Sequence, residues 1–237
     1  MKYTIIVDLW QVDIYNVSCV YKIHILKKRV DIMPSETFKN LDENKKQRLI
    51  KAAIEEFSRV SFSEASINNI INNAKISRGS FYMYFENKDD LFKYILNFHK
   101  QKFNELIKIN LKKNNGDIKI AFGDMFDDII NYISKNNVDF FKNVFLNMNY
   151  MNQNYIVPRK EDYSKKNINE FSEYVNQDIL NINEKVTLSD IFEILLGITI
   201  PAIIHSIIGK VPIEIIKDKY MKKLELVCYG IYRKENE

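Results

Sequence analysis

Residues 76–92 read ISRGSFYMYFENKDDLF, and this stretch combines aromatic rings with Arg78, Gly79 and Ser80. A helix that only packs in a core gains nothing from a glycine, which is costly within helices. A helix that only faces solvent has no use for so many aromatic side chains. The stretch therefore predicts a short helix that packs on its neighbours with one side and meets a partner with the other.

The residues before this stretch predict two further helices and a tight turn. Residues 41–60 read LDENKKQRLIKAAIEEFSRV, with Asp42 as an N-cap and an apolar stripe at helical spacing. Ser66 is expected to cap a short helix, INNIINNA, and Ser77 to cap the next one. Two short helices joined by a few residues are typical of a helix-turn-helix, whose second helix enters the DNA major groove by its N-terminal end.

The residues of this second helix suit contact with DNA. Gly79 removes a side chain where the duplex comes close, and Ser80 offers a small hydroxyl. Arg78 has the geometry to donate two hydrogen bonds to guanine O6 and N7. The hydroxyl groups of Tyr82 and Tyr84 suit phosphate oxygens. These aromatic side chains therefore face DNA in this interpretation, and the alternative is that both tyrosines are core residues.

Lys88 opens the next predicted helix, residues 88–113, which Asn87 caps. Its charge and the free N–H groups of the first turn favour phosphate. Loss of Lys88 is then expected to weaken binding to every sequence and to lower the salt slope by about one unit. Ile76, Phe81 and Phe85 are expected to anchor the short helix. The alternatives are that Arg78 and Lys88 are ordinary solvated charges and that Ser66 and Ser77 are caps only.

Residues 45–95 resemble the DNA-binding region of TetR-family transcription regulators. The most specific part of the resemblance is the run ISRGSFYMYF at residues 76–85, followed by Lys88, Asp90, Leu91 and Phe92. The resemblance implies phosphate contacts by Ser66, Tyr82, Tyr84 and Lys88, and base contacts around residues 78–81. Lys75 stands where the family commonly has Gly, and a positive φ there would cost about 1 kcal/mol. The predicted DNA-binding residues are Ser66, Ser77, Arg78, Gly79, Ser80, Phe81, Tyr82, Tyr84 and Lys88.

The resemblance also implies an all-α homodimer, with an N-terminal three-helix helix-turn-helix head and a C-terminal helical ligand-binding and dimerisation bundle. The head is expected at residues 33–95 and the body at 96–237. Residues 1–32 alternate apolar and polar positions, which is strand-like. Met33 begins a run typical of a protein start. We therefore expect that translation begins at Met33 and that residues 1–32 result from a misplaced start codon. The alternative is a real extension that packs on the body.

The body is predicted to contain helices at residues 117–135, 139–150, 161–180, 188–208 and 212–234. Its middle helices are rich in aromatic residues, which favours a pocket for an apolar or aromatic effector. The alternative is that these residues are simply core. The last two helices are apolar enough to form a dimer interface, where Gly197 and Ala202 would allow close approach, or else the core of the monomer. The predicted effector-binding residues are Phe122, Phe126, Phe145, Met148 and Tyr174.

Composition and motifs restrict the function further. The net charge is +4, and residues 33–90 hold nine basic and nine acidic residues, so bulk charge alone does not indicate a nucleic-acid partner. Two distant cysteines and the lack of an apolar run of membrane-spanning length favour a cytoplasmic protein without a membrane partner. Three scattered histidines and no recognisable catalytic motif predict no catalytic residue, no metal site and no cofactor.

These observations predict a sequence-specific DNA-binding transcriptional regulator, a repressor that is not an enzyme. Its expected partners are a palindromic double-stranded operator, a second copy of the chain and an unidentified small-molecule effector that changes operator affinity. The alternative is a helical adaptor or small-molecule-binding protein whose helix-turn-helix head contacts protein rather than DNA.

Overall fold

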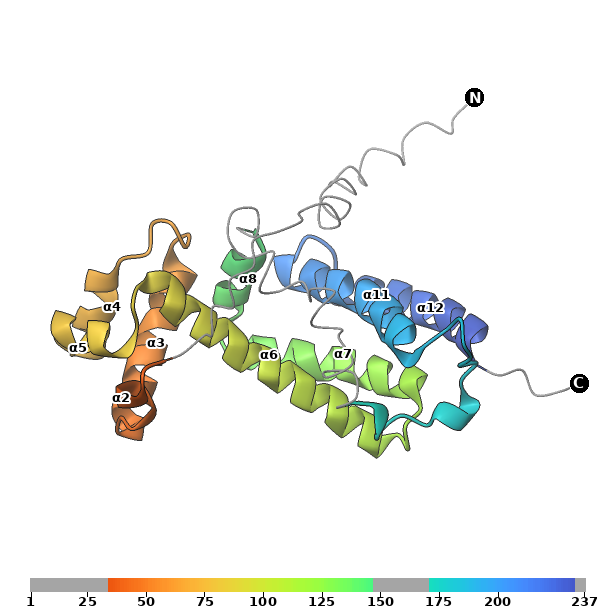
Figure 1. Ribbon diagram of the computed structural model, residues 1–237. Helices are drawn as coiled ribbons and strands as arrows, with labels where there is room; N and C mark the ends of the chain where they lie inside the picture. The colour runs from red at the N-terminus through yellow and green to blue at the C-terminus, as the bar shows by residue number, and fades with distance from the viewer. Residues whose placement is uncertain (1–33, 147–170, 233–237) are drawn as a thin grey trace, which may run out of the picture. The chain divides into compact units, whose positions relative to one another are not determined.

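The computed structural model describes residues 34–146 and 171–232 of the 237-residue chain. The chain divides at residue 32, and the described residues all belong to the part that follows. Within these ranges the regular structure is helical, apart from one isolated bridge between Leu180 and Tyr232 (Figure 1). The all-α expectation is confirmed. The expected strand-like character of residues 1–32 lies outside the described residues.

Three helices form the predicted helix-turn-helix head: α3 (Glu43–Arg59), α4 (Ile67–Ala74) and α5 (Arg78–Tyr84). The side chains of Asp42 and Ser77 accept the N–H groups of Lys45 and Ser80 and so cap α3 and α5, as their positions predicted. Ser66 stands at the N-cap of α4 but makes no side-chain cap hydrogen bond, which corrects the expected role of its hydroxyl.

The head closes around one apolar core. Leu49, Phe57 and Ile70 are buried where α3 packs on α4, and Phe81 and Phe85 anchor α5. A short helix that the sequence did not predict, α2 (Glu36–Lys39), adds Phe38 to this core. The Phe38 ring lies 4.8 Å from the Phe85 ring, between centroids. Residues before α3 therefore help to fix the position of α5.

One long helix leads from the head into the body. Helix α6 (Lys88–Lys113) begins at its predicted N-cap, Asn87, and packs along α7 (Ile118–Lys135). Gly116 lies in the turn between them with a φ of +79°, and a Cβ there would come within 2.2 Å of the backbone nitrogen of Asn176. That nitrogen donates to the Gly116 carbonyl at 3.1 Å. The turn therefore requires glycine, because a distant segment packs directly against it.

Helix α8 (Val138–Leu146) follows α7 and contacts α3, α7 and α11 (Leu188–Ile208). The sequence predicted this helix to run to residue 150, and residues 147–150 lie outside the described residues. A predicted helix over residues 161–180 is confirmed at residues 171–172 and is wrong at residues 173–180, and its first ten residues lie outside the described ranges. Residues 177–179 form a single 3-10 turn, η1 (Gln177–Ile179), because Asn176 and Asn181 donate their N–H groups to Gly116 and Ile231 rather than along a helix.

The last two helices are α11 and α12 (Ile213–Ile231), which pack on each other. A capping box between Thr187 and Asp190 begins α11. Among the described helices, α11 is the one long and apolar enough to cross a bilayer by length and composition, a test that core helices of soluble proteins also pass. Only 33% of its most apolar window is buried, so much of its apolar surface is left for another contact.

Candidate nucleic-acid interface

The turn between α4 and α5 holds the two helices in the helix-turn-helix arrangement. Lys75 ends α4 in the left-handed conformation, with a φ of 55°. The N–H of Ile76 then donates to the carbonyl of Ile71 at 3.1 Å, which closes the helix end. Lys75 therefore adopts the positive φ whose cost was considered above, and the turn forms without a glycine.

Gly79 lies in the first turn of α5 with open space in front of it. A Cβ at this position would meet only the Ser77 hydroxyl, at 3.9 Å. The interior of the chain therefore does not demand a glycine here. The Ser77 hydroxyl accepts the N–H of Ser80 at 3.0 Å and lies 2.9 Å from the Ser80 hydroxyl. The N-terminal end of α5 presents small polar groups on an open surface.

Arg78 is held beside this surface by its neighbours. Its guanidinium donates to the Asn68 side-chain oxygen at 2.6 Å and to the Tyr82 hydroxyl at 3.2 Å. It also lies 5.5 Å from the centre of the Tyr82 ring. Tyr82 is 46% exposed, so this pair remains accessible on the outer face of α5.

Two of the predicted DNA-contact residues, Phe81 and Tyr84, lie on the side of α5 that faces the core. Phe81 is fully buried, so it anchors α5 and does not reach a base. Tyr84 is only 8% exposed and packs near Phe38, with 5.9 Å between ring centroids. The expectation that the Tyr84 ring stands on the DNA side is therefore corrected: the spacing of α5 places residues 81, 84 and 85 on the face that covers the core.

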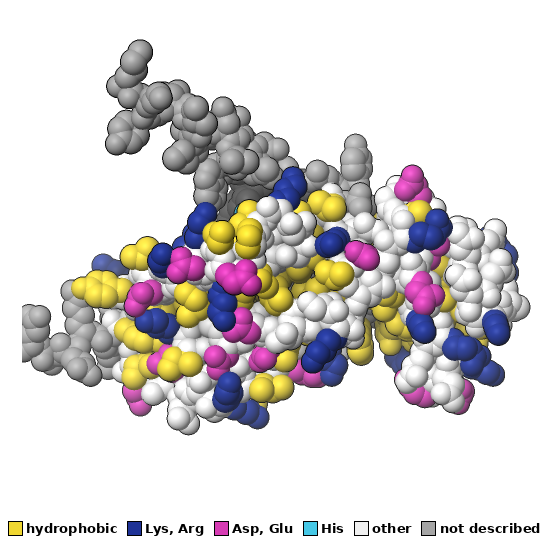
Figure 2. All heavy atoms as spheres, turned by 180° about the vertical axis from the view of Figure 1, so that it is seen from behind, with side chains coloured by type: hydrophobic (Ala, Val, Ile, Leu, Met, Phe, Trp, Pro, Cys, Tyr) yellow, Lys and Arg dark blue, Asp and Glu magenta, His cyan; other side chains and the backbone are white. Residues whose placement is uncertain are grey.

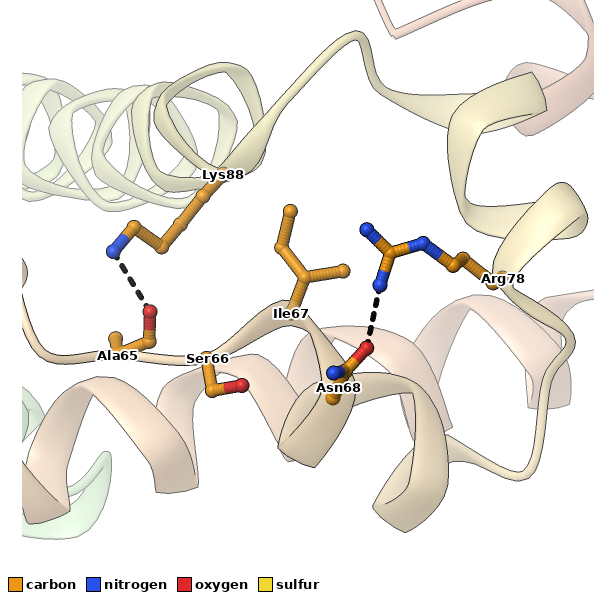
Figure 3. Close-up of a pocket in the computed structure, with 6 residues that line it drawn as sticks. All are labelled: Ala65, Ser66, Ile67, Asn68, Arg78 and Lys88. Carbon is orange, nitrogen blue, oxygen red and sulfur yellow. Dashed lines mark hydrogen bonds between the residues drawn. The ribbon is translucent and has the colours of Figure 1, made fainter.

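A shallow cleft of about 280 Å³ lies where the N-terminal ends of α4, α5 and α6 converge (Figure 3). The basic side chains of Lys88 from α6 and Arg78 from α5 lie at its two ends, with Ile67 between them. The first N–H groups of a helix have no intrahelical partner, and they add positive potential at the start of α4. The residues that line the cleft are Ala65, Ser66, Ile67, Asn68, Arg78 and Lys88.

Lys88 reaches from α6 to the loop between α3 and α4. Its ammonium donates to the carbonyls of Phe62, Ala65 and Ser63 at 2.6, 2.7 and 3.1 Å. It also lies 4.8 Å from the centre of the Phe62 ring. Burial lowers the pKa of Lys88, and the nearby Glu56 carboxylate opposes that effect.

Glu56 holds the other side of the same loop. Its carboxylate accepts the backbone N–H of Ser66 at 2.9 Å and the Asn69 amide at 3.0 Å, and it pairs with Arg59 at 2.8 Å. Burial raises the pKa of Glu56, but hydrogen bonds from Ser66, Arg59 and Asn69 outweigh it and leave the pKa below its ordinary value. Sequence analysis missed Glu56, although its position in α3, seven residues after Leu49, places it on the buried side.

The comparisons with known proteins match both parts of this chain. A family model described as bacterial regulatory proteins, tetR family, matches residues 49–95, and one described as tetracyclin repressor-like, C-terminal domain, matches residues 117–231. The chain belongs to the TetR family of transcriptional regulators. The first match contains α4, α5 and the cleft, and the second contains α7, α8, α11 and α12.

Curated relatives in this TetR-family comparison match over short segments only. The uncharacterized HTH-type transcriptional regulator YdgC of Bacillus subtilis (strain 168) is 39% identical over 57 residues, which are 24% of this chain and 29% of YdgC. The uncharacterized HTH-type transcriptional regulator YuxN of the same organism is 31% identical over 71 residues, 30% of this chain and 24% of YuxN. The matches thus span less than a third of each relative's length.

Solved structures support the TetR-family fold. A TetR family transcription regulator from Marinobacter aquaeolei VT8 aligns with a TM-score of 0.54 and 14% identity, over 81% of this chain and 98% of that one. A TetR family transcriptional regulator from Chloroflexus aurantiacus J-10-FL aligns with a TM-score of 0.50 and 20% identity, over 85% of this chain and all of the other. At these identities the similarity concerns the fold alone.

The structure does not place the predicted effector-binding residues of this TetR-family chain around one described cavity. Phe122 and Phe126 are fully buried in α7, where they pack near Phe192 and Tyr220. Phe145 is half-buried on α8, and Met148 lies outside the described residues. The ring of Tyr174 faces the ammonium of Lys112, 4.5 Å from its centre.

Within the described ranges of this TetR-family chain, the candidate metal ligands do not cluster. No group of three or more His, Cys, Asp or Glu residues is placed there to hold a metal ion. Asp124 and Asp127 each pair with a lysine of the chain itself, Lys113 and Lys217.

Proposed function

We propose that this TetR-family chain is a homodimeric repressor that binds a palindromic operator through its head and loses affinity for it when a small molecule binds in its body. The observation that carries the DNA-binding part is the outer surface of α5. This surface has open space at Gly79 and an exposed Arg78–Tyr82 pair. It lies directly beside a cleft that is lined by the basic side chains of Arg78 and Lys88.

This surface suits both kinds of contact that DNA recognition needs. The forked guanidinium of Arg78 is already oriented by Asn68 and Tyr82, and a guanine edge would replace these neutral acceptors. The start of α4 suits a phosphate group, because the Ser66 hydroxyl there does not cap the helix. Base readout is therefore assigned to α5 and backbone contact to α4.

The surfaces of α11 and α12 support a dimer. A Cβ at Gly197 of α11 or at Gly230 of α12 would meet nothing within 4 Å, so neither glycine is needed for packing inside the chain. Leu226 and Tyr229 of α12 are 74% and 78% exposed. Figure 2 shows hydrophobic side chains among charged ones on the molecular surface. A second copy that packs on α11 and α12 would cover this apolar area. It would also place the two α5 helices roughly 34 Å apart, the spacing of successive major grooves on one side of the duplex.

Effector control is proposed to work by a population shift. Helix α6 begins at Lys88 in the head and ends at Lys113 in the body, so it joins both parts in one element. An effector that favours a different position of α6 would lower operator affinity by its coupling free energy, typically about 1–3 kcal/mol.

A gel-shift assay with the gene's own upstream DNA tests this function. We expect the purified dimer to prefer this DNA over random competitor at low salt, and a panel of small molecules to include one that releases it. Arg78→Ala should reduce the preference between sequences about tenfold or more. Absence of any preference for double-stranded DNA would overturn the proposal, and capture of a protein by the head would instead support the adaptor alternative.

A further inference from the structure

The ammonium group of Lys88 has no donor left for another partner in this geometry. A lysine ammonium has three N–H donors and no acceptor. Three backbone carbonyls, those of Phe62, Ser63 and Ala65, lie within 3.1 Å of its nitrogen. The ring of Phe62 lies close to the same group. A phosphate oxygen could reach Lys88 only if it displaced one of these contacts.

The loop that Lys88 holds is also held from its other side. Residues 60–66 connect α3 to α4, and the Glu56 carboxylate binds the last N–H of this loop, that of Ser66. Glu56 is 3% exposed, so its hydrogen bonds are shielded from water. Glu56 of α3 and Lys88 of α6 therefore clamp this one connection between them. The carboxylate accepts a backbone N–H, and the ammonium donates to backbone carbonyls.

The position of this loop sets the position of the phosphate-binding groups. Ser66 ends the loop as the N-cap of α4, so its hydroxyl and the free N–H groups in the first turn of α4 move with residues 60–66. Arg78 is tied to the same helix start through Asn68. A displaced loop would therefore shift the proposed phosphate contact and the orientation of the base-reading arginine together.

We infer that Lys88 is a positioning residue for DNA binding, whose ammonium fixes the loop between α3 and α4 so that the start of α4, rather than Lys88 itself, meets the phosphate. The inference rests on the proposed function and deepens it. It replaces the sequence expectation that Lys88 contributes a point charge to the DNA backbone.

The salt dependence of binding separates the two roles. Each phosphate that a lysine neutralises adds about 0.9 to the slope of log K against log salt, and each dimer has two copies of Lys88. We expect Lys88→Met to weaken operator binding about tenfold at fixed salt and to leave the slope unchanged. Lys51→Met, which removes an exposed positive charge from α3, is the matched control and should keep wild-type affinity. A slope that falls by about 1.8, or unchanged affinity in Lys88→Met, would overturn the inference.

A second variant keeps the charge and changes only the geometry. In Lys88→Arg, the donors form a planar fork that cannot converge on three carbonyls around one nitrogen, whereas a fork suits phosphate well. We expect Lys88→Arg to bind the operator more weakly than wild type, measured well below its melting temperature. Binding as tight as wild type or tighter would show that Lys88 contacts phosphate.

Amide hydrogen exchange tests the clamp without DNA. In Lys88→Met, the Ser66 amide, which donates to Glu56, should exchange faster than in wild type, while amides in the second half of α6 should not change. Unchanged exchange at Ser66 would overturn the clamp. This measurement needs no operator, so it tests the contact between Lys88 and the loop independently of the proposed function. Failure of the wild-type protein to prefer any DNA would count against the proposed function alone.

Discussion

At the scale of single residues, Lys75 occupies a conformation that its side chain disfavours. Its φ of 55° lies in the left-handed region at the end of α4. A residue with a Cβ in this region costs about 1 kcal/mol relative to glycine. We predict that Lys75→Gly raises the free energy of unfolding by about 1 kcal/mol, measured by urea denaturation. Lys51→Gly, within α3, is a control that should lower it by a similar amount. A destabilised Lys75→Gly would contradict this account of the turn.

His99 is a second residue whose surroundings make a measurable prediction. Its side chain is 4% exposed among Phe140, Phe141 and Tyr132, and its Nδ1 lies 2.8 Å from the Tyr132 hydroxyl. Its Nε2 has no hydrogen-bond partner in the part of the chain that the structure describes. Burial lowers the pKa of His99 from 6.5 to about 4, so the folded protein holds it neutral.

This shift predicts a pH dependence of stability. Between pH 6.5 and about 4 the unfolded chain binds a proton at His99 that the folded chain does not, so the free energy of unfolding falls as the pH decreases through this window. We predict that His99→Leu abolishes a part of this fall on the order of 2–3 kcal/mol. Urea denaturation of both proteins from pH 7 to pH 4 measures the difference. Parallel pH profiles would show that His99 does not carry it.

At the scale of elements, α8 connects the body to the end of α3. The side-chain amide of Asn143 donates to the carbonyls of Ser58 and Phe57 at 2.7 and 3.0 Å. These are among the last carbonyls of a helix, which lack intrahelical partners. We predict that Asn143→Ala lowers the free energy of unfolding by about 1–2 kcal/mol and speeds exchange of amides in α3. Asn136→Ala, at the exposed end of α7, is the control. A neutral Asn143→Ala would mean that water replaces this contact fully.

The elements also show what sequence patterns predict and what they do not. Caps and apolar spacing predicted α5, α6 and α11 well, because Ser77, Asn87 and the apolar run after Thr187 act locally. The helix predicted around Gln177 is replaced by a turn. Local patterns do not reveal this turn, because its backbone partners, Gly116 and Ile231, are distant in sequence. Lys88 and Tyr84 were found by motif, but their surroundings depend on how α3, α5 and α6 pack, which no local pattern contains.

At the scale of the whole molecule, the proposed dimer depends on the exposed side of α11. A side chain at Gly197 would meet no atom of its own chain, so Gly197→Glu should keep the fold, as judged by helical circular dichroism. We predict that it places a charge in the dimer interface, gives a monomer in sedimentation velocity and weakens operator binding at least a hundredfold. A variant that remains dimeric would exclude this face as the interface.

Helix α8 also gives the protein a second route between its parts. Within nine residues it contacts α7 and α11 as well as α3. In the effector-controlled repressor proposed above, two chemically unrelated inducers could therefore act independently, one by tilting α6 and another by withdrawing Asn143 from α3. Their contributions to derepression would add as free energies, so that two weak inducers given together would produce the response of one strong inducer.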